Sequence, residues 1–217
     1  AIAEALAEAH PDKPMWPADP TLRAKARSMT AEMHSGYGAL RAACPMNLAH
    51  SWVGFEPSDD VLADCARIET LWADALAVSG GPWLCGDYSI VDAFFAPVAA
   101  RFATYRLPRS DLSDAYITTH LADGDFRRWR AMGRAQNHHQ PFYDFDLEKD
   151  IWPGPDLISA RAVDAGPSEN ANCPYSGKPV TDFLELDGRI YGFCNPFCRD
   201  KTVADPAAWP AFMDLLP

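Results

Sequence analysis

The fold of the C-terminal part of this chain is decided by residues 172–206, which read NCPYSGKPVTDFLELDGRIYGFCNPFCRDKTVADP. The stretch contains Cys173, Cys194 and Cys198, with twenty and then three residues between them and turn-forming residues close to each. Thiolates at this spacing are typical of a zinc knuckle, in which one ligand lies on a turn and a pair lies at the start of a helix. The pattern therefore predicts one metal site whose ligands are these three cysteines.

The segment between the cysteines predicts a β-hairpin. Residues 180–186 and 189–193 are rich in strand-forming residues, and they flank Asp187 and Gly188. An Asp-Gly pair supplies the two positive φ values that a tight type I′ turn requires. Such a hairpin returns the second cysteine of the stretch to the first.

A short helix is expected directly after the hairpin. Asn195 is suited to cap this helix, and Pro196 is suited to its first position, where no backbone N–H is needed. Cys198 would then lie about one helical turn beyond Cys194, so both sulfur atoms would be able to reach one ion.

These residues resemble the small heavy-metal-associated modules called TRASH or YHS-like domains. The resemblance covers residues 170–217 and is carried by the three-cysteine spacing together with the wording CPYSGKPV, YGFC, FCRDK and ADP. Many such domains have a further cysteine three positions after the first, where this chain has Ser176. The fourth ligand is therefore left open between water, Asp182, Asp200 and a group from another part of the chain.

Zinc is the expected metal, because thiolates bind it and it performs no redox chemistry; copper(I) is the alternative. Without metal, the three cysteines would be buried and reduced, or Cys194 and Cys198 would form a disulfide. Bound metal is favoured, because an unclamped module of about forty residues can hardly bury enough apolar surface to fold.

The composition limits the classes of protein to which the chain can belong. Its 217 residues suffice for one substantial domain and a minor one. Thirty acidic residues exceed nineteen basic ones, and the net charge of −11 argues against nucleic-acid binding through the phosphates. No apolar run is long enough to cross a bilayer, so no membrane partner is expected. Because Cys44, Cys65 and Cys85 are scattered singly, the cysteines indicate no secreted disulfide framework and predict a reducing cytoplasm.

Helical periodicity dominates the chain before the cysteine module. The predicted helical segments are residues 1–9, a long helix from Asp19 to Cys44, residues 58–79, a helix that begins at Ser89, and residues 113–121 and 125–136. The first two are joined by the proline-rich linker PDKPMWPADP. We expect residues 19–139 to form an antiparallel helical bundle, residues 140–168 an irregular connector that packs along it, and residues 169–217 the metal module.

One helix start carries a recognisable capping pattern. Ser89 and Asp92 stand three positions apart, which is close to a capping box with Asp in place of Glu. Such a pair satisfies backbone N–H groups at the start of a helix. We therefore interpret these two residues as a folding device and not as catalytic groups.

The order of these segments resembles the helical C-terminal domain of the glutathione S-transferase family. The resemblance covers residues 1–135 and is carried by a helix end, a proline-rich linker, EMHSGYGALRAACPMNL and GPWLCGDYSIVDAFFAPVAARF. It implies a mainly α fold of the glutathione S-transferase C-terminal type, with residues 1–18 as the last helix and linker of a preceding thioredoxin-like domain. In that family the thioredoxin-like domain activates the glutathione thiol, so this chain alone is expected to be inactive.

The resemblance also implies a substrate wall on the first long helix. There His34 and Arg41 are two turns apart, with Tyr37 between them, and we expect these three residues to meet a polar or anionic group of the substrate. In the alternative interpretation, Arg41 pairs with Glu32 or a neighbouring residue, and His34 is a hydrogen-bonded packing residue. No residue is assigned a catalytic role.

The implied function of the intact protein is transfer of glutathione, the cosubstrate, to a hydrophobic electrophile, and the resemblance also allows a homodimer. The rival interpretation is a metal-handling or metal-sensing protein that uses the helical bundle as a scaffold. A thioredoxin-like domain upstream in the natural gene would favour the enzyme, and its loss would favour the rival.

Overall fold

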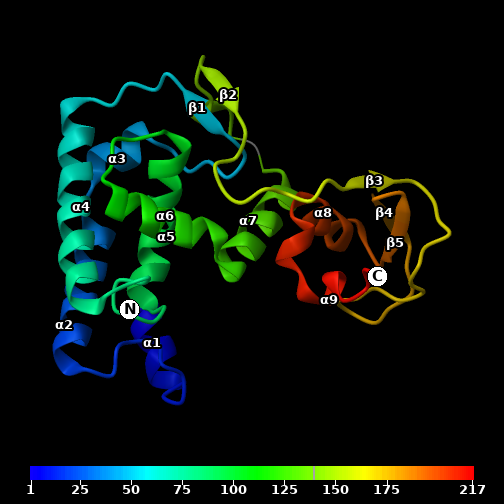
Figure 1. Cartoon of the computed structure of the whole chain (residues 1–217), viewed down its shortest axis with the longest axis horizontal. Helices are drawn as coiled ribbons and strands as arrows, with labels where there is room; N and C mark the ends of the chain where they lie inside the picture. The colour runs from blue at the N-terminus through cyan, green and yellow to red at the C-terminus, as the bar shows by residue number, and fades with distance from the viewer. Residues whose placement is uncertain (139) are drawn as a thin grey trace. The chain divides into compact units, whose positions relative to one another are not determined.

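The computed structural model describes residues 1–138 and 140–217, and the chain divides into two compact units (Figure 1). The first unit contains Ala1–Leu121 and Phe145–Pro153, and the second contains Ala122–Asp144 and Gly154–Pro217. Each unit therefore consists of two separate stretches of the chain. Among the described residues, no helix is both long enough and apolar enough to cross a membrane.

The first unit is mainly helical and carries one small sheet. The helices described in it are α1 (Ile2–Ala9), α2 (Pro20–Ser35), α3 (Gly38–Ala43), α4 (Asp59–Ser79), α5 (Ile90–Thr104) and α6 (Asp111–Ala122). Strand β1 (Ser51–Val53) pairs antiparallel with β2 (Glu148–Asp150), and Trp52 lies opposite Lys149. The mainly α class expected from the sequence is confirmed.

Helix boundaries in this unit follow local capping rules. The Asp19 side chain accepts a hydrogen bond from the Leu22 amide at 2.8 Å, directly before Pro20 at the first helical position. Ser58 caps α4 in the same way, and Gly80 ends that helix with a φ of 77°. These caps satisfy backbone groups that a helix end leaves free, and the predicted boundaries at these positions are confirmed.

The prediction of a single long helix from Asp19 to Cys44 is wrong, because this segment forms two helices, α2 and α3. The backbone turns at Gly36, and Tyr37 then adopts a left-handed φ of 58°. A Cβ at Gly36 would lie 2.7 Å from the Glu32 carbonyl oxygen, so glycine is required at this helix end. Periodicity missed the break, since apolar residues recur at helical spacing on both sides of it. The predicted end at Cys44 is confirmed, because this residue caps α3.

Asp92 anchors the start of α5 from a buried position. Its carboxylate is 0% exposed and accepts hydrogen bonds from the amides of Ser89 and Leu84, each at 3.0 Å. The Tyr116 hydroxyl on α6 also donates to it, at 2.9 Å. Burial raises the pKa of this carboxyl, whereas the hydrogen bonds lower it. The capping box is therefore confirmed as a folding device, and it also joins α5 to α6.

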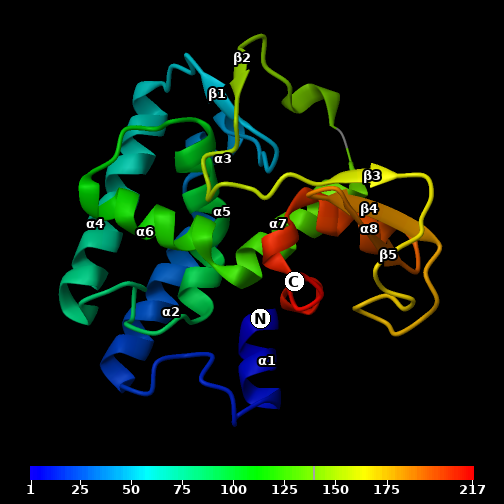
Figure 2. The same cartoon turned by 45° about the vertical axis from the view of Figure 1, so that its right-hand side comes forward.

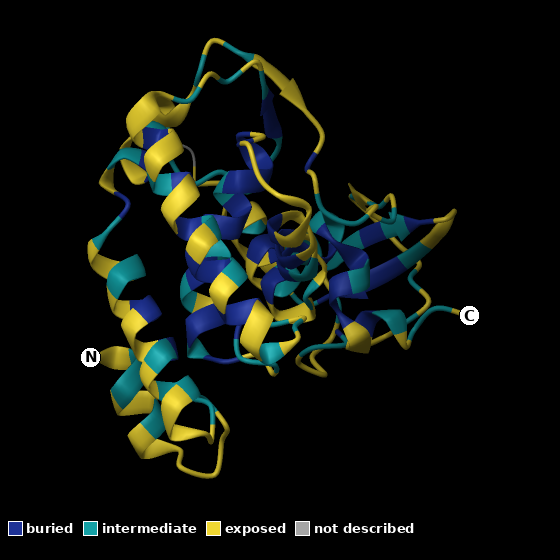
Figure 3. Cartoon of the chain, turned by 60° about the vertical axis from the view of Figure 1, so that its left-hand side comes forward, coloured by how far each residue is buried: buried dark blue, intermediate teal, exposed yellow. Residues whose placement is uncertain are grey.

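The core of the first unit is rich in aromatic residues. Trp72 on α4 is 0% exposed and packs against three other rings, with centroids 4.9, 5.4 and 5.7 Å away, from Tyr116, Phe102 and Phe95. Figure 3 shows buried residues on the inner sides of the helices, whereas helix α1, next to the N-terminus, is exposed or half-buried along its length. Each large apolar side chain removed from water stabilises the fold by roughly 1.5–3 kcal/mol.

The connector predicted at residues 140–168 is not irregular throughout, because it contributes strands β2 and β3 (Arg161–Val163). In the first unit, Phe145 packs edge-on against Trp52 and Phe55, with ring centroids 5.4 and 5.8 Å apart. Trp152 is buried as well, but Phe142 is 73% exposed. Strands of three residues carry little sequence signal, which explains why the prediction missed them.

The second unit combines a three-stranded antiparallel sheet with short helices. Its strands lie in the order β3, β4 (Asp182–Leu186) and β5 (Arg189–Phe193), and Figure 2 shows α8 beside them. The helices described in this unit are α7 (Gly124–Gln136), η1 (Pro141–Tyr143), α8 (Pro196–Ala204), η2 (Pro206–Ala208) and α9 (Pro210–Met213). The predicted hairpin and the helix that follows it are present as β4, β5 and α8.

Helix α7 belongs to the second unit, although its sequence pattern predicted that it is part of the bundle of residues 19–139. It packs against α8, and Arg127 forms two hydrogen bonds of 2.6 and 2.9 Å with the Asp205 carboxylate. Asp205 is 1% exposed, and Arg130 on the same helix is 3% exposed. Arg127 and Arg130 are therefore built into the second unit. The last residue of the predicted bundle, His139, lies outside the described residues.

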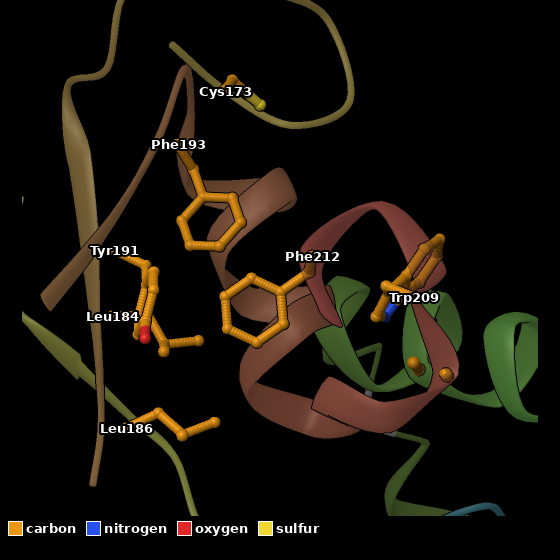
Figure 4. Packing of buried hydrophobic residues seen from close by; sticks show 9 residues of the cluster. Cys173, Leu184, Leu186, Tyr191, Phe193, Trp209 and Phe212 are labelled. Carbon is orange, nitrogen blue, oxygen red and sulfur yellow. The ribbon is translucent and has the colours of Figure 1, made fainter. Parts of the chain in front are cut away.

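The core of the second unit lies between the sheet and the short helices (Figure 4). The rings of Phe193 and Phe212 have centroids 5.9 Å apart, and Tyr191 meets Phe212 edge-on at 5.3 Å. Cys173 belongs to the same buried cluster and is 2% exposed. Apolar packing therefore fixes the position of Cys173, the first of the three predicted metal ligands in the sequence.

Candidate metal centre

The sulfur atoms of Cys173, Cys194 and Cys198 all lie within 4.8 Å of one another. They come from a turn, from the end of β5 and from the first turn of α8. The hairpin makes this convergence possible, because Asp187 and Gly188 have φ values of 49° and 76°, as a type I′ turn requires. The structure thus brings the three predicted ligands together.

Cys173 lies on a tight turn that directs amides toward its sulfur atom. Its own amide donates to the Lys178 carbonyl at 2.8 Å, and the Gly177 amide donates to the Cys173 carbonyl at 2.9 Å. The amides of Tyr175 and Ser176 donate to the Cys173 sulfur. A turn of this kind holds a thiolate well, because its N–H groups stabilise negative charge.

Asn195 organises the other two cysteines. Its Oδ1 accepts a hydrogen bond from the Cys198 amide at 2.9 Å, which caps α8 as predicted, with Pro196 at the first position. Its Nδ2 donates to the Cys194 sulfur at 3.2 Å, a contact that the sequence did not predict. The Ser176 hydroxyl donates to the same sulfur at 3.1 Å.

The acidity of the cysteines differs within the cluster. Burial raises the pKa of Cys173, but hydrogen bonds from the Tyr175 and Cys194 amides lower it, to about 7 overall. Burial raises the pKa of Cys198 to about 11, and the negative charges of the other two cysteines add to this rise. Three thiolates at such separations repel one another, so a bound cation is what allows all three to be ionised together.

The cysteines outside the cluster behave as packing residues. Burial raises the pKa of Cys44 and Cys65 to about 12 and that of Cys85 to about 11. Such thiols stay neutral at neutral pH and are poor nucleophiles, and none of the three belongs to the cluster of sulfur atoms. All six cysteines of the chain are free, so the alternative of a disulfide between Cys194 and Cys198 is not found in the structure.

A half-buried lysine on α8 supplies positive charge near the sulfur atoms. The Nζ of Lys201 lies 3.9 Å from the ring centroids of both Tyr175 and Trp209, and 6.0 Å from that of Phe197. Cation–π contacts of this kind hold an ammonium group in place. Burial lowers the pKa of Lys201, whereas the negative charges of the three cysteines raise it. The lysine therefore offsets part of the negative charge of the thiolates.

Neither carboxylate expected as the fourth ligand joins the sulfur atoms. Within residues 1–138 and 140–217, the cluster contains three cysteine sulfurs and no carboxylate or imidazole. Asp182 accepts hydrogen bonds from Arg199 at 3.4 Å and from the Thr181 hydroxyl at 2.8 Å. Asp200 accepts one from the Arg199 Nε at 2.8 Å. Arg199 thus holds both carboxylates in ion pairs.

The donor set fits a soft or borderline metal ion. Thiolates bind zinc at about 2.3 Å, which in a tetrahedral site places the sulfur atoms about 3.8 Å apart. Sulfur atoms that already lie within 4.8 Å of one another reach that separation through small side-chain rotations. Thiolate ligands favour zinc and copper(I), so both expected metals remain compatible with the site.

Lys201 and its aromatic partners are the part of the site that the sequence analysis missed. Lys201 lies three residues after Cys198, and this helical spacing, which puts both residues on one side of α8, is the signal that was available. Its contact with Trp209 depends on how the chain turns after α8, which no short-range pattern specifies.

The three residues predicted as a substrate wall do not share one surface. Tyr37 is 6% exposed, and its hydroxyl donates to Glu32 at 3.1 Å. The Arg41 guanidinium donates to the His34 carbonyl at 3.1 Å, and so it satisfies the end of α2. Glu32 is paired with Arg67 at 2.7 Å, so Arg41 is held by the backbone of its neighbour His34 and not by Glu32.

Two of these residues, His34 and Arg41, do meet at a hollow on the surface of the first unit. It has a volume of about 430 Å³ and also includes Phe94, Pro97 and Arg101. A second hollow of about 530 Å³ shares His34 and Phe94 with the first and is lined mostly by residues of α1 and α2. Two arginines and one aromatic residue therefore contribute to the lining of this hollow.

Comparison with known proteins provides no family for this chain. No protein-family model matches it, and no curated protein does. The functional conclusion therefore depends on the chemistry and geometry of the cysteine cluster and of the two hollows.

Proposed function

We propose that this chain is a metal-binding protein whose second unit holds one zinc ion through the thiolates of Cys173, Cys194 and Cys198. The observation that carries the proposal is the convergence of three sulfur atoms, within 4.8 Å, from a turn, a strand end and a helix start. The resemblance to TRASH or YHS-like modules supports it, and copper(I) is the alternative ion for the same ligands. When bound, the ion would offset most of the negative charge of the thiolates and would cross-link the three segments.

Metal analysis of the reduced protein tests this proposal. Protein purified without chelators should contain about one zinc per chain, and Cys194→Ser should lose it. Cys85→Ser is the matched control and should keep the metal, because Cys85 lies in the first unit and burial raises its pKa to about 11. Absence of stoichiometric metal from the wild-type chain would contradict the proposal.

A specific observation also favours a glutathione-dependent function for the first unit. One hollow combines Arg41 and Arg101 with His34, and the other hollow adds volume beside the shared Phe94. This combination suits a substrate that joins an anionic group to a hydrophobic one. We therefore propose that the first unit is a helical domain of the glutathione S-transferase C-terminal type. It would form the electrophile side of a transferase site, with glutathione as cosubstrate.

Such a transferase needs a group that activates the glutathione thiol. Among the described residues that line the two hollows, none is a Ser, Tyr or Cys. An unperturbed thiol has a pKa of about 8.5 and is mostly protonated at neutral pH. We therefore expect the chain of residues 1–217 to bind an aromatic electrophile without accelerating its conjugation.

Binding and turnover measurements separate these two steps. A nonreactive analogue of an aromatic electrophile should bind the wild-type chain, and Phe94→Ala should weaken that binding by about tenfold through lost apolar contact. Phe142→Ala is the control, because Phe142 is 73% exposed and lies in the second unit. Absence of binding would contradict the transferase proposal. Conjugation well above the uncatalysed rate would instead direct attention to the cysteines as reactive groups.

A further inference from the structure

We propose that the metal site of the second unit takes its fourth ligand from solution, as the thiolate of a small molecule. This inference rests on the proposed metal binding by Cys173, Cys194 and Cys198. Three thiolates leave one position of a tetrahedral ion unfilled, and an unfilled position distinguishes a site that exchanges ligands from a closed structural site.

The described part of the chain offers no fourth charged or imidazole donor at the cluster. The nearest candidates by sequence, Asp182 and Asp200, are both engaged by Arg199. The Ser176 hydroxyl directs its proton to the Cys194 sulfur at 3.1 Å, and a neutral hydroxyl is a weak ligand for a soft ion. Among the described residues, the position of the fourth ligand is therefore left to a group from solution.

The cluster is open to solvent on one side. Cys173 is 2% exposed, whereas Cys194 and Cys198 are only partly buried. Ser176 and Asn195, which both donate to the Cys194 sulfur, are exposed residues. A small molecule is therefore able to approach the ion from the side of Cys194 and Cys198 while Cys173 stays in the core.

Softness favours a thiolate over water as this ligand, although the thiolate adds negative charge to the site. A divalent ion bound by three thiolates leaves one negative charge in excess, and a fourth thiolate adds another. Lys201, held 3.9 Å from the ring centroids of Tyr175 and Trp209, offsets this charge. Soft ions that accept three thiolates also prefer a further sulfur ligand to a hard oxygen ligand.

Cobalt(II) substitution makes the fourth ligand visible, because the sulfur-to-cobalt charge-transfer absorption grows with the number of bound thiolates. The whole chain, loaded with cobalt, would be titrated with glutathione and, as a control, with S-methylglutathione, which has no free thiol. We expect glutathione to raise the absorption by about one third, as three thiolates become four, and S-methylglutathione to leave it unchanged.

Two variants of one residue sharpen the titration. Ser176→Cys places a fourth thiol where the present side chain already contacts Cys194, so its spectrum should match that of wild type with glutathione and should not respond further. Ser176→Ala keeps the position open and should respond as wild type does. If the cobalt spectra of Ser176→Ala and wild type are identical before glutathione is added, the serine hydroxyl is not the fourth ligand.

The outcomes distinguish this inference from the proposal on which it rests. A wild-type chain that fails to bind stoichiometric cobalt would overturn both. Bound cobalt whose absorption stays constant or falls with glutathione would overturn the inference alone, and so would an equal response to S-methylglutathione. The titrations of wild type and Ser176→Ala suffice to test the inference, so the test remains valid even if Ser176→Cys does not fold.

Discussion

The two units of the chain assemble their candidate sites in different ways. In the second unit, three cysteines converge through a turn, a hairpin and a capped helix, all within residues 173–198. In the first unit, His34 and Arg41 meet Phe94 because α2 packs against α5 and α3 follows α2 closely in the chain. Rules of local backbone geometry suffice to assemble the cysteine cluster of the second unit. The hollow of the first unit, in contrast, depends on tertiary packing.

The units also differ in what holds them together. The first unit is built around the aromatic rings that surround Trp72, which is 0% exposed. The second unit has a smaller buried cluster, and one candidate metal ligand, Cys173, is a member of it. Loss of the metal and loss of a core ring should therefore damage different parts of the chain.

Removal of the metal is expected to have the largest effect. Structural zinc contributes an apparent 10–16 kcal/mol in small zinc modules, about ten times a typical side-chain contact. Chelator-treated protein should therefore become sensitive to protease within residues 154–217, while α2, α4 and α5 keep their helical structure. Limited proteolysis and circular dichroism, with and without chelator, check this. Loss of the entire helical signal would show that the two units are not independent.

Trp72→Ala should destabilise the first unit, which does not contain the metal site. Deleting a fully buried Trp leaves a cavity and should lower the free energy of unfolding of the first unit by about 3–5 kcal/mol. Urea unfolding measures the loss, and the variant should still contain about one zinc per chain. Trp129→Ala, at a side chain that is 44% exposed, is the control and should change stability little. Loss of zinc from Trp72→Ala would show that the metal site depends on the core of the first unit.

Acid should weaken the first unit through His120. Burial lowers the pKa of His120 to about 3, and among the described residues neither ring nitrogen has a hydrogen-bond partner. The unfolded chain, with an ordinary pKa near 6.5, binds more protons below that pH, so stability falls as the pH drops from 6.5 toward 3. Between pH 6.5 and pH 5 the loss should be about 2 kcal/mol.

Urea unfolding at the two pH values, compared with His120→Phe, isolates this contribution. A phenyl ring keeps the packing against Trp83 and Tyr116, whose ring centroids lie 4.9 and 4.6 Å from that of His120, and it does not titrate. The variant should therefore lose less stability on acidification than the wild type does. An equal loss in both proteins would rule out His120 as the cause.

Lys201→Gln should have the smallest effect. Replacing the ammonium group between Tyr175 and Trp209 removes a charge that offsets the thiolates, which should weaken zinc binding by about 1 kcal/mol, or about fivefold. Competition with a chromophoric chelator measures the affinity. Lys178→Gln, on an exposed part of the same module, is the control. Equal affinities for Lys201→Gln and wild type would show that this charge does not act on the metal.

Much of the cysteine cluster in the second unit could be predicted from the sequence, because each structural element that forms it is short-range. The Asp187-Gly188 turn, the Asn195 cap and the cysteine spacing each depend on residues a few positions apart. The geometry of the candidate substrate wall in the first unit was predicted less well. The wall was placed on one continuous helix, but the close approach at Gly36 and the left-handed Tyr37 redirect the chain and bury the tyrosine side chain.

Features that join distant parts of the sequence were not predicted. The pairing of Arg127 with Asp205 assigns α7 to the second unit, yet the helical pattern of α7 is equally compatible with the bundle. The pairing of β2 with β1 was missed for the same reason, since three-residue strands gain their identity from a partner far along the chain. In both cases the deciding information is the complementarity between the partners.

The position of α7 has a consequence for how the protein is made. Arg127 and Asp205 are 78 residues apart, so a ribosome that adds roughly 5–20 residues per second needs about 4–16 s to supply the acidic partner after the arginine has been synthesised. The first unit also waits, because β1 has no partner until residues 148–150 are made. Throughout that interval the nascent chain carries Arg127 without its acidic partner and β1 as an unpaired strand edge, which is the kind of surface that makes a partly made chain prone to aggregate.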